Sequence, residues 1–224
     1  MTTAVFSVVN AVLFRPLPWP EADRLVAIYA VIPERRSEPS AAATWNRAPL
    51  SWPASRQLQA ESAFADFGVW YRASYIFGLP AVDMVEVWHV SASLPRMLGA
   101  RPTLGRFFVR EEDDDSSSQA VVISYECWQR RYGGRQDVVG QTASLALVAG
   151  EHVVRTIVGV LPPGFGLGGS APEFLLPMGQ RARFALSNYA IGRLAPGVSL
   201  TAAAPVVEAI VARTSTSSGS RSSC

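Results

Sequence analysis

Apolar and polar residues alternate along two neighbouring stretches of this chain, which is the pattern of half-buried β-strands. Within residues 64–79, Phe67, Val69 and Tyr71 alternate with Gly68, Trp70 and Arg72. Residues 82–91 alternate in the same way. Near the end of the chain the spacing changes, and an apolar stripe typical of an amphipathic helix is formed by Val206, Val207, Ile210 and Val211. Strands and helices mix without long regular crossovers, so we expect an α+β fold and not a doubly wound sheet.

Residues 120–165 predict strand, short helix and strand in succession. Ala120–Ile123 is a β-branched run, Ser124 is placed to cap a helix, and Gly133 with Gly134 is placed to end it. Further strands are predicted over residues 142–148 and 153–160, and Pro162 and Pro163 follow the last of these. The block contains no catalytic motif, so we interpret it as scaffold.

Three more elements are predicted outside that block. A strand is expected over residues 24–32, and a helix is expected from the capping residue Ser51 to about Glu61, with Pro53 in its first turn. The C-terminal helix has two candidate N-caps, Ser199 and Thr201. If Thr201 is the cap, Pro205 falls in the first turn, where its missing N–H costs little.

Four segments, in the same order along the chain, resemble one known family. They are TAVFSVVNAVLFRPLPWPEADRLVAI, VSASLPRMLGARPTLGRFF, the block AVVISYECWQRRYGGRQDVVGQ with VVRTIVGVLPPGF, and IGRLAPGVSLTAAAPVVEAIVAR. Together they resemble the MacB-like periplasmic core domain of FtsX-like ABC transporter permeases, of the duplicated orphan type. The resemblance implies a mixed sheet with short packing helices over residues 16–213.

Both ends of the chain suggest a fragment of such a permease. Residues 2–14 are apolar, but as a helix they reach only about 20 Å, against the roughly 30 Å of a bilayer core. On the pattern alone we would expect a buried or amphipathic helix, and the resemblance implies that residues 1–15 are the outer part of a truncated transmembrane helix. No basic n-region or cleavage site of a secretory signal precedes Arg15. Residues 214–224 are low in complexity and are predicted to be disordered.

The charge pattern excludes two functions. The net charge is +2 and the sequence contains no Lys, so it lacks the lysine that a phosphate-binding loop needs and is not itself an ATPase of the usual kind. Arg residues are scattered, whereas a nucleic-acid binder gathers its basic residues on one face, so we expect no nucleic-acid partner. The two adjacent pairs, Arg35–Arg36 and Arg130–Arg131, are expected to be solvated.

Two sequence clusters could hold a ligand, and for both the structural interpretation is favoured. The acidic run consists of Glu111, Glu112, Asp113, Asp114 and Asp115. It could ligate a hard cation through oxygen, but it lacks the spacing and the glycine of a calcium loop, so we expect a solvated loop and no metal. The glycine cluster consists of Gly164, Gly166, Gly168 and Gly169. It follows a Pro-Pro break and leads into no helix, so we expect a flexible loop and no nucleotide cofactor.

No catalytic residue is expected. His89 and His152 have neither a nucleophile nor a second ligand at a telling spacing. Cys127 lies in the predicted short helix and Cys224 ends the chain, so a disulfide between them is not favoured. The sequence therefore predicts a protein that is not an enzyme.

The resemblance implies a non-catalytic extracytoplasmic domain, on the periplasmic side of the inner membrane, that transmits motion from a separate cytoplasmic ABC ATPase. The motion would act on an exported substrate or on an envelope adaptor. The alternative is a periplasmic interaction module that recruits or regulates an envelope protein such as a cell-wall hydrolase. Residues 70–77, rich in aromatic side chains, are a candidate partner contact, although packing in the core is the favoured interpretation.

Overall fold

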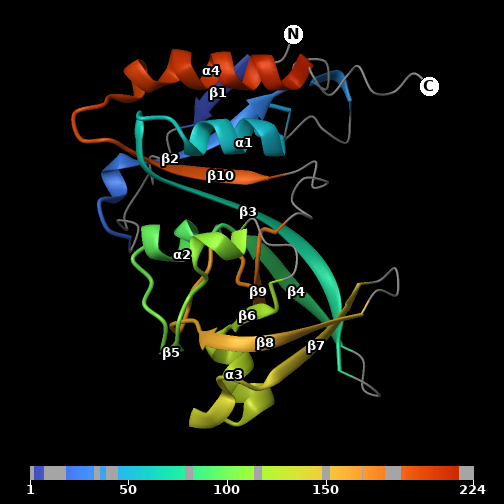
Figure 1. The fold of residues 1–224 in the computed structure, drawn as a ribbon. Helices are drawn as coiled ribbons and strands as arrows, with labels where there is room; N and C mark the ends of the chain where they lie inside the picture. Colours follow the sequence, from blue (N-terminus) through green and yellow to red (C-terminus); the bar gives the residue numbers. More distant parts are fainter. Residues whose placement is uncertain are drawn as a thin grey trace. The chain divides into compact units, whose positions relative to one another are not determined.

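The protein was analysed as a computed structural model. The structure describes residues 3–7, 19–32, 36–38, 45–78, 83–113, 118–147, 152–167, 169–179 and 188–216. The chain divides into two compact units, Met1–Val69 with Arg183–Cys224, and Trp70–Ala182 (Figure 1). Each unit is described by itself.

The first unit is an antiparallel sheet covered by two helices. Strand β2 (Leu25–Val31) pairs with β1 (Thr3–Ser7) on one side and with β10 (Tyr189–Leu194) on the other. Helices α1 (Trp52–Gln59) and α4 (Leu200–Thr216) run side by side over this sheet (Figure 1). Their buried apolar residues are Ala54, Leu58, Ala203, Val207, Ile210 and Val211. Three members of the predicted apolar stripe of the C-terminal helix, Val207, Ile210 and Val211, are thus confirmed on its packing face, whereas Val206 is half-buried.

The helix ends follow local sequence signals, with one correction. The Ser51 hydroxyl caps α1, accepting a hydrogen bond from the Ala54 N–H at 3.4 Å, as predicted. In α4 the capping residue is Ser199, which accepts from the Ala202 N–H at 3.2 Å. Because the helix begins at Leu200, Pro205 lies inside it and not in the first turn. Helix α4 also continues to Thr216, so residues 214–216 are helical where a disordered tail was predicted, and residues 217–224 lie outside the described residues.

The prediction of an N-terminal helix is wrong for the part that the structure describes. Thr3–Ser7 forms β1, in antiparallel register with β2 from Thr3 opposite Val31 to Ser7 opposite Ala27. A short apolar run fits a strand as well as a helix, and here β2 supplies the backbone partners. The remainder of residues 1–15 lies outside the described residues. Among the helices that are described, none is both long and apolar enough to cross a bilayer.

The second unit contains strands that close into a ring. Strand β3 (Phe64–Phe77) begins in the first unit and its later part pairs with both β4 (Asp83–Val90) and β7 (Thr142–Leu147). From β7 the pairing passes to β8 (His152–Val160), β6 (Ala120–Ile123), β9 (Phe174–Pro177) and back to β4. Six strands therefore form a small closed barrel, which leaves few strand edges unpaired.

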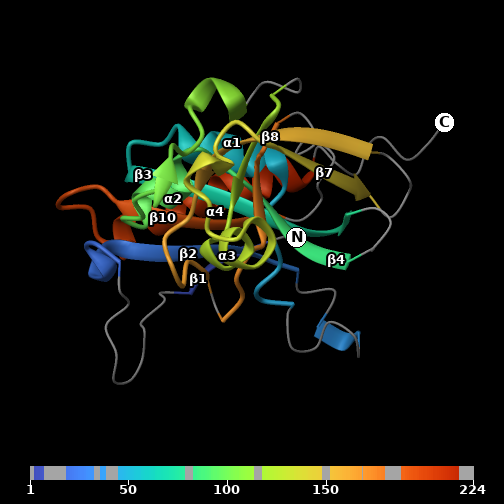
Figure 2. The ribbon, with the colours of Figure 1, turned by 90° about the horizontal axis from the view of Figure 1, so that it is seen from below.

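The barrel encloses one apolar core, and helix α3 (Tyr125–Tyr132) packs onto it. The enclosed side chains, one or more from each strand, include Tyr75, Val85, Val87, Val121, Ile123, Leu145, Ile157, Phe174 and Leu176. Cys127 and Trp128 of α3 belong to the same buried cluster. Figure 2 gives a second view of the strands of this unit. The predicted α+β class with a mixed sheet and short packing helices is confirmed.

The block at residues 120–165 folds as its sequence predicts. Ser124 caps α3 by accepting a hydrogen bond from the Cys127 N–H at 3.0 Å, and Gly133 ends the helix in the left-handed conformation with φ 61°. Strands β7 and β8 lie within one residue of the predicted ranges. Both helix signals act within a few residues, which is why sequence alone locates them.

Candidate functional site

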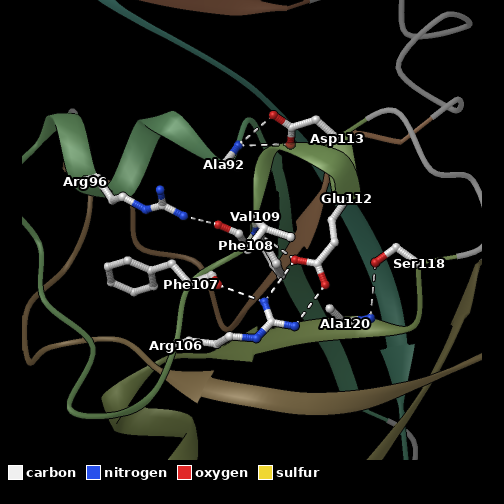
Figure 3. A network of polar contacts seen from close by, with 10 residues as sticks. All are labelled: Ala92, Arg96, Arg106, Phe107, Phe108, Val109, Glu112, Asp113, Ser118 and Ala120. Carbon is white, nitrogen blue, oxygen red and sulfur yellow. Dashed lines mark hydrogen bonds and ion pairs between the residues drawn. The ribbon is translucent and has the colours of Figure 1, made fainter.

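The acidic run is the one candidate cation site of the sequence. The carboxylates of Glu112 and Asp113, in the described part of this run, bind protein groups of the second unit. Residues Arg110–Asp113 form a short 3-10 helix. Glu112 faces Arg106, with Arg106 Nη1 3.0 Å from Glu112 Oε2 and Nη2 3.1 Å from Oε1 (Figure 3). Glu112 Oε2 also accepts a hydrogen bond from the Val109 N–H at 2.8 Å. One guanidinium and one backbone amide therefore occupy this carboxylate.

Asp113 is buried, with 6% of its surface exposed, and holds the start of helix α2 (Ser93–Met97). Both carboxylate oxygens lie 2.9 Å from the Ala92 amide nitrogen (Figure 3). A carboxylate before a helix also interacts favourably with the positive end of the helix dipole. At the other end of α2, Arg96 donates to the Phe108 carbonyl oxygen. The network thus joins α2 to residues 106–113 at two points.

Two glycines allow the strand before this network to approach β8 closely. In β5 (Leu104–Gly105), Gly105 is paired with Gly159 of β8. A Cβ atom at Gly105 would lie 2.1 Å from the Val158 carbonyl oxygen, and one at Gly159 would lie 2.1 Å from the Arg106 carbonyl oxygen. Neither position has room for a side chain, so the segment that carries Arg106 is fixed against the barrel.

The prediction of a solvated loop is therefore wrong for Glu112 and Asp113, which are bound by protein groups. The hydrogen bond and the charge of Glu112 raise the pKa of the Arg106 guanidinium, against a smaller opposing effect of burial. Asp114 and Asp115 lie outside the described residues. Within the part of the chain that is described, no group of three or more His, Cys, Asp or Glu is placed to hold a metal ion.

The two histidines lie in different surroundings. His89 in β4 is buried, its Nε2 lies 3.0 Å from the Tyr75 hydroxyl, and its ring stacks on Tyr71 with centroids 4.4 Å apart. His152 is exposed at the start of β8. The structure thus places His89 among packed aromatic rings of β3 and β4, as expected for a structural histidine.

Cys127 is a buried thiol and not an activated one. Its side chain is fully buried, and burial raises its pKa from 9.0 to about 11, although Arg131 and Arg130 act in the opposite direction. A thiol with a raised pKa is a weak nucleophile at neutral pH because little thiolate is present. Cys224 lies outside the described residues, so its pairing stays untested.

The aromatic segment and the glycine cluster are largely structural where they are described. Along residues 70–77, Tyr75 is buried, Trp70 is half-buried and stacks on Trp88, and Arg72 and Ser74 are exposed. In the glycine cluster, Leu167 and Ser170 form an isolated β-bridge, and the Ser170 hydroxyl donates to Glu86 Oε1 at 2.8 Å. A hydrogen bond therefore joins this loop to β4. Gly168 lies outside the described residues.

Sequence reasoning missed a second polar cluster, centred on Arg131 of α3. The pair Arg130–Arg131 was expected to be solvated, and the exposed fraction of the Arg130 side chain is 60%. For Arg131 the fraction is 17%, and its guanidinium binds Glu173 and Asp83. Its acidic partners lie 42 and 48 residues away in the sequence, so no local pattern could have indicated the cluster.

Comparison with known proteins assigns the chain to a family. The sequence model of the MacB-like periplasmic core domain matches residues 1–210, so the chain belongs to this family, and the predicted resemblance is confirmed. It is an extracytoplasmic domain of the MacB-like, ABC-type permease class. A search of curated proteins finds no match.

Solved structures share the fold at low sequence identity. A permease-protein domain from Porphyromonas gingivalis is 16% identical, with a TM-score of 0.60 and coverage of 87% of this chain and 86% of that one. The periplasmic region of MacB from Actinobacillus actinomycetemcomitans is 12% identical, with a TM-score of 0.62 and coverage of 96% and 100%. The extracellular domain of the noncanonic ABC-type transporter YknZ from Gram-positive bacteria is 12% identical, with a TM-score of 0.61 and coverage of 86% and 95%.

Proposed function

We propose that this domain transmits motion, as a body, from a separate cytoplasmic ATPase through its permease to an exported substrate or an envelope partner. The ATPase is the partner that an ABC-type transporter implies. The domain supplies no chemistry of its own in this proposal. It is carried by membrane segments of the permease and acts by displacing what it contacts.

The observation that supports the proposal is the closure of the second unit. Six strands of this unit, β3, β4, β9, β6, β8 and β7, pair in a ring around one buried core. A ring cannot shift one strand without breaking ladder hydrogen bonds on both sides, so such a unit resists deformation. The charged groups of the acidic run that could have served a site, Glu112 and Asp113, are used instead to hold α2 and residues 106–113 in place.

Distance measurements in the assembled permease with its ATPase test the proposal. Spin labels at Val139→Cys and Val154→Cys, both exposed, report the internal geometry of the second unit. Cys127→Ala and Cys224→Ser remove the native thiols. We expect the distance between the two labels to stay the same with and without ATP, while the distance from either label to labelled lipid headgroups changes. An ATPase-inactive variant is the control, and it should abolish the change.

Two outcomes contradict the proposal. One is a nucleotide-dependent change in the distance between the two labels of the second unit, which would mean that the unit deforms. The other is the absence of any nucleotide-dependent distance in a permease that still transports.

The alternative, a module that recruits an envelope protein, draws support from exposed apolar side chains on the barrel strands. The exposed fractions are 70% for Met84 of β4 and 53% for Val154 of β8. Contiguous exposed apolar surface marks contact sites, whereas single exposed side chains are weaker support. Purification of the permease from cross-linked envelopes, with Met84→Ser and Val154→Ser as the matched control, distinguishes the two functions. A cell-wall hydrolase that is lost with these substitutions favours recruitment.

A further inference from the structure

The barrel has a place where its backbone ladder stops short. Strand β9 pairs in parallel with residues 87–90 of β4, and the last backbone bond on that side runs from the Glu173 N–H to the Glu86 carbonyl oxygen at 2.8 Å. Residues 83–85 of β4 still pair with β3 but lie beyond the β9 ladder. Among the described residues, backbone pairing therefore holds the start of β4 on one side, through β3.

Arg131 of α3 occupies the position where that ladder ends. Its Nε and Nη2 lie 3.2 and 3.1 Å from Glu173 Oε1, and Nη2 lies 3.3 Å from Oε2. Its Nη1 lies 3.0 Å from Asp83 Oδ2, at the first residue of β4. The guanidinium also lies over the ring of Phe77, 4.7 Å from its centroid, at the last residue of β3. One side chain thus joins the start of β9, the start of β4 and the end of β3.

We propose that Arg131 is a latch that completes the barrel between β4 and β9 where hydrogen bonds of the backbone do not. With the latch closed, the start of β4 is held against the rest of the barrel. With the latch open, Asp83 and Met84 lose their connection to α3 and to the start of β9 but stay paired with β3, while α3 stays in place. This device goes beyond the proposed function, because it is a property of the second unit whatever drives the domain.

Arg131 joins helix α3 to the start of β4. The other interactions that hold these two elements differ. On the helix side, Cys127 and Trp128 are buried in the barrel core, Ser124 caps the helix, and Trp128 Nε1 donates to the Arg135 carbonyl oxygen at 2.8 Å. On the strand side, the side chain of Asp83 is 64% exposed and Met84 is 70% exposed, and burial holds β4 only from Val85 onward, which lies in the barrel core. Release of the latch should therefore act on β4 and not on α3.

Arg131 makes two charged pairs, one with Glu173 (the Glu173 arm of the latch) and one with Asp83 (the Asp83 arm). These two arms should differ in strength. The side chains of Arg131 and Glu173 are 17% and 16% exposed, so their paired hydrogen bonds are shielded from solvent. Water and salt screen a charge pair more when one partner is exposed, as Asp83 is. Salt should consequently weaken the Asp83 arm first.

Amide hydrogen exchange of the full 224-residue chain tests the latch. In Arg131→Gln we expect the amides of residues 83–85 to exchange about tenfold faster or more, as for the loss of a charged hydrogen-bond pair, while the Trp128 amide changes by less than about threefold. Arg130→Gln is the matched control, since Arg130 also pairs with Glu173 but is 60% exposed. It should leave residues 83–85 close to the parent rate.

Two further variants keep the test decisive if Arg131→Gln does not fold. Asp83→Asn weakens the β4 arm alone, and Phe77→Leu removes the ring under the guanidinium. Each should speed exchange at residues 83–85 by a smaller factor, and 0.5 M salt should do the same in the parent chain. Two results overturn the latch. One is an equal acceleration of amide exchange in α3 and in residues 83–85 of β4. The other is unchanged exchange at residues 83–85 in both Asp83→Asn and Phe77→Leu. Because no ATPase takes part, this result is independent of the proposed transmission of motion.

Discussion

The two units of this chain show two ways of organising strands. In the first unit the sheet is open, and helices α1 and α4 cover its face. In the second unit the strands return on themselves, and their side chains fill the interior. An open sheet must bury its face against another element, whereas a closed barrel is its own second layer. The difference predicts that helix packing governs the stability of the first unit and strand packing that of the second.

Polar side chains stabilise both units. In the first unit, buried Arg193 donates to the carbonyl oxygens of Pro20 and Glu21, and Thr214 donates to the carbonyl oxygen of Ile210. Both units also contain charged pairs, such as Arg24 with Glu21 in the first and Arg106 with Glu112 and Arg131 with Glu173 in the second. Arg131 and Glu173 are 42 residues apart, so this pair joins elements that are distant in the sequence, at the place where closure of the barrel is incomplete.

The largest effects should come from truncation of one core side chain in each unit. Phe174→Ala removes a fully buried ring from the barrel core and should lower the free energy of unfolding of the second unit by about 3–5 kcal/mol. Leu58→Ala removes a fully buried side chain from α1 and should lower that of the first unit by about 2–5 kcal/mol. Hydrogen exchange at increasing urea concentration measures each unit separately.

The pattern of protection from exchange shows whether the two units unfold independently. If the units are separate cooperative bodies, each variant should lose protection mainly in its own unit. Uniform loss throughout the described residues in both variants would show one cooperative structure instead.

A smaller effect should appear at alkaline pH through Cys127. The pKa of this thiol in the folded chain, about 11, lies above its value of 9.0 in the unfolded chain, because burial disfavours the thiolate. The unfolded chain thus loses the proton first, and the stabilising contribution present below pH 9 is lost as the pH rises to 11. The loss should be about 2–3 kcal/mol. Urea unfolding at pH 8 and pH 11 should show a smaller decrease for Cys127→Ala than for the parent chain.

The smallest effects should separate the two helix caps. Ser124 is buried and Ser199 is exposed, and each accepts one hydrogen bond from a backbone amide in the first turn of its helix. Ser199→Ala should cost about 0.5–1 kcal/mol, and Ser124→Ala about 1–2 kcal/mol because the amide left behind is shielded from water. Thermal unfolding of both variants measures the difference, and equal costs would argue against the role of burial.

Local signals made much of the fold predictable from the sequence. Caps at Ser51 and Ser124, the stop at Gly133 and the alternation along β3 and β4 each act over a few residues, and the structure agrees with them. The N-terminal strand was not predictable, since its short apolar run is ambiguous until β2 is known as its partner. The closure of the barrel was hidden for the same reason, because it depends on pairings between strands far apart in the sequence.

The polar clusters were the hardest part to predict. The sequence predicts a solvated acidic run, since five adjacent carboxylates repel one another. Asp113 is nevertheless buried and accepts a hydrogen bond from the Ala92 amide. Arg130 and Arg131 are identical in sequence terms, but adjacent helix positions point in different directions, so only Arg131 reaches Asp83. Both arginines pair with Glu173, so the sequence shows how many charges lie together and the fold decides which partners each of them reaches.

The contact between Gly105 and Gly159 limits how this domain can change over time. A steric conflict between two side chains can be relieved by shrinking the neighbour, so one substitution can compensate for another. Here each position is already as small as an amino acid can be, and the atom that a new Cβ would meet belongs to the backbone of the opposite segment. No second substitution nearby can make room, so variants that survive at either site would have to shift the whole β5 segment away from β8.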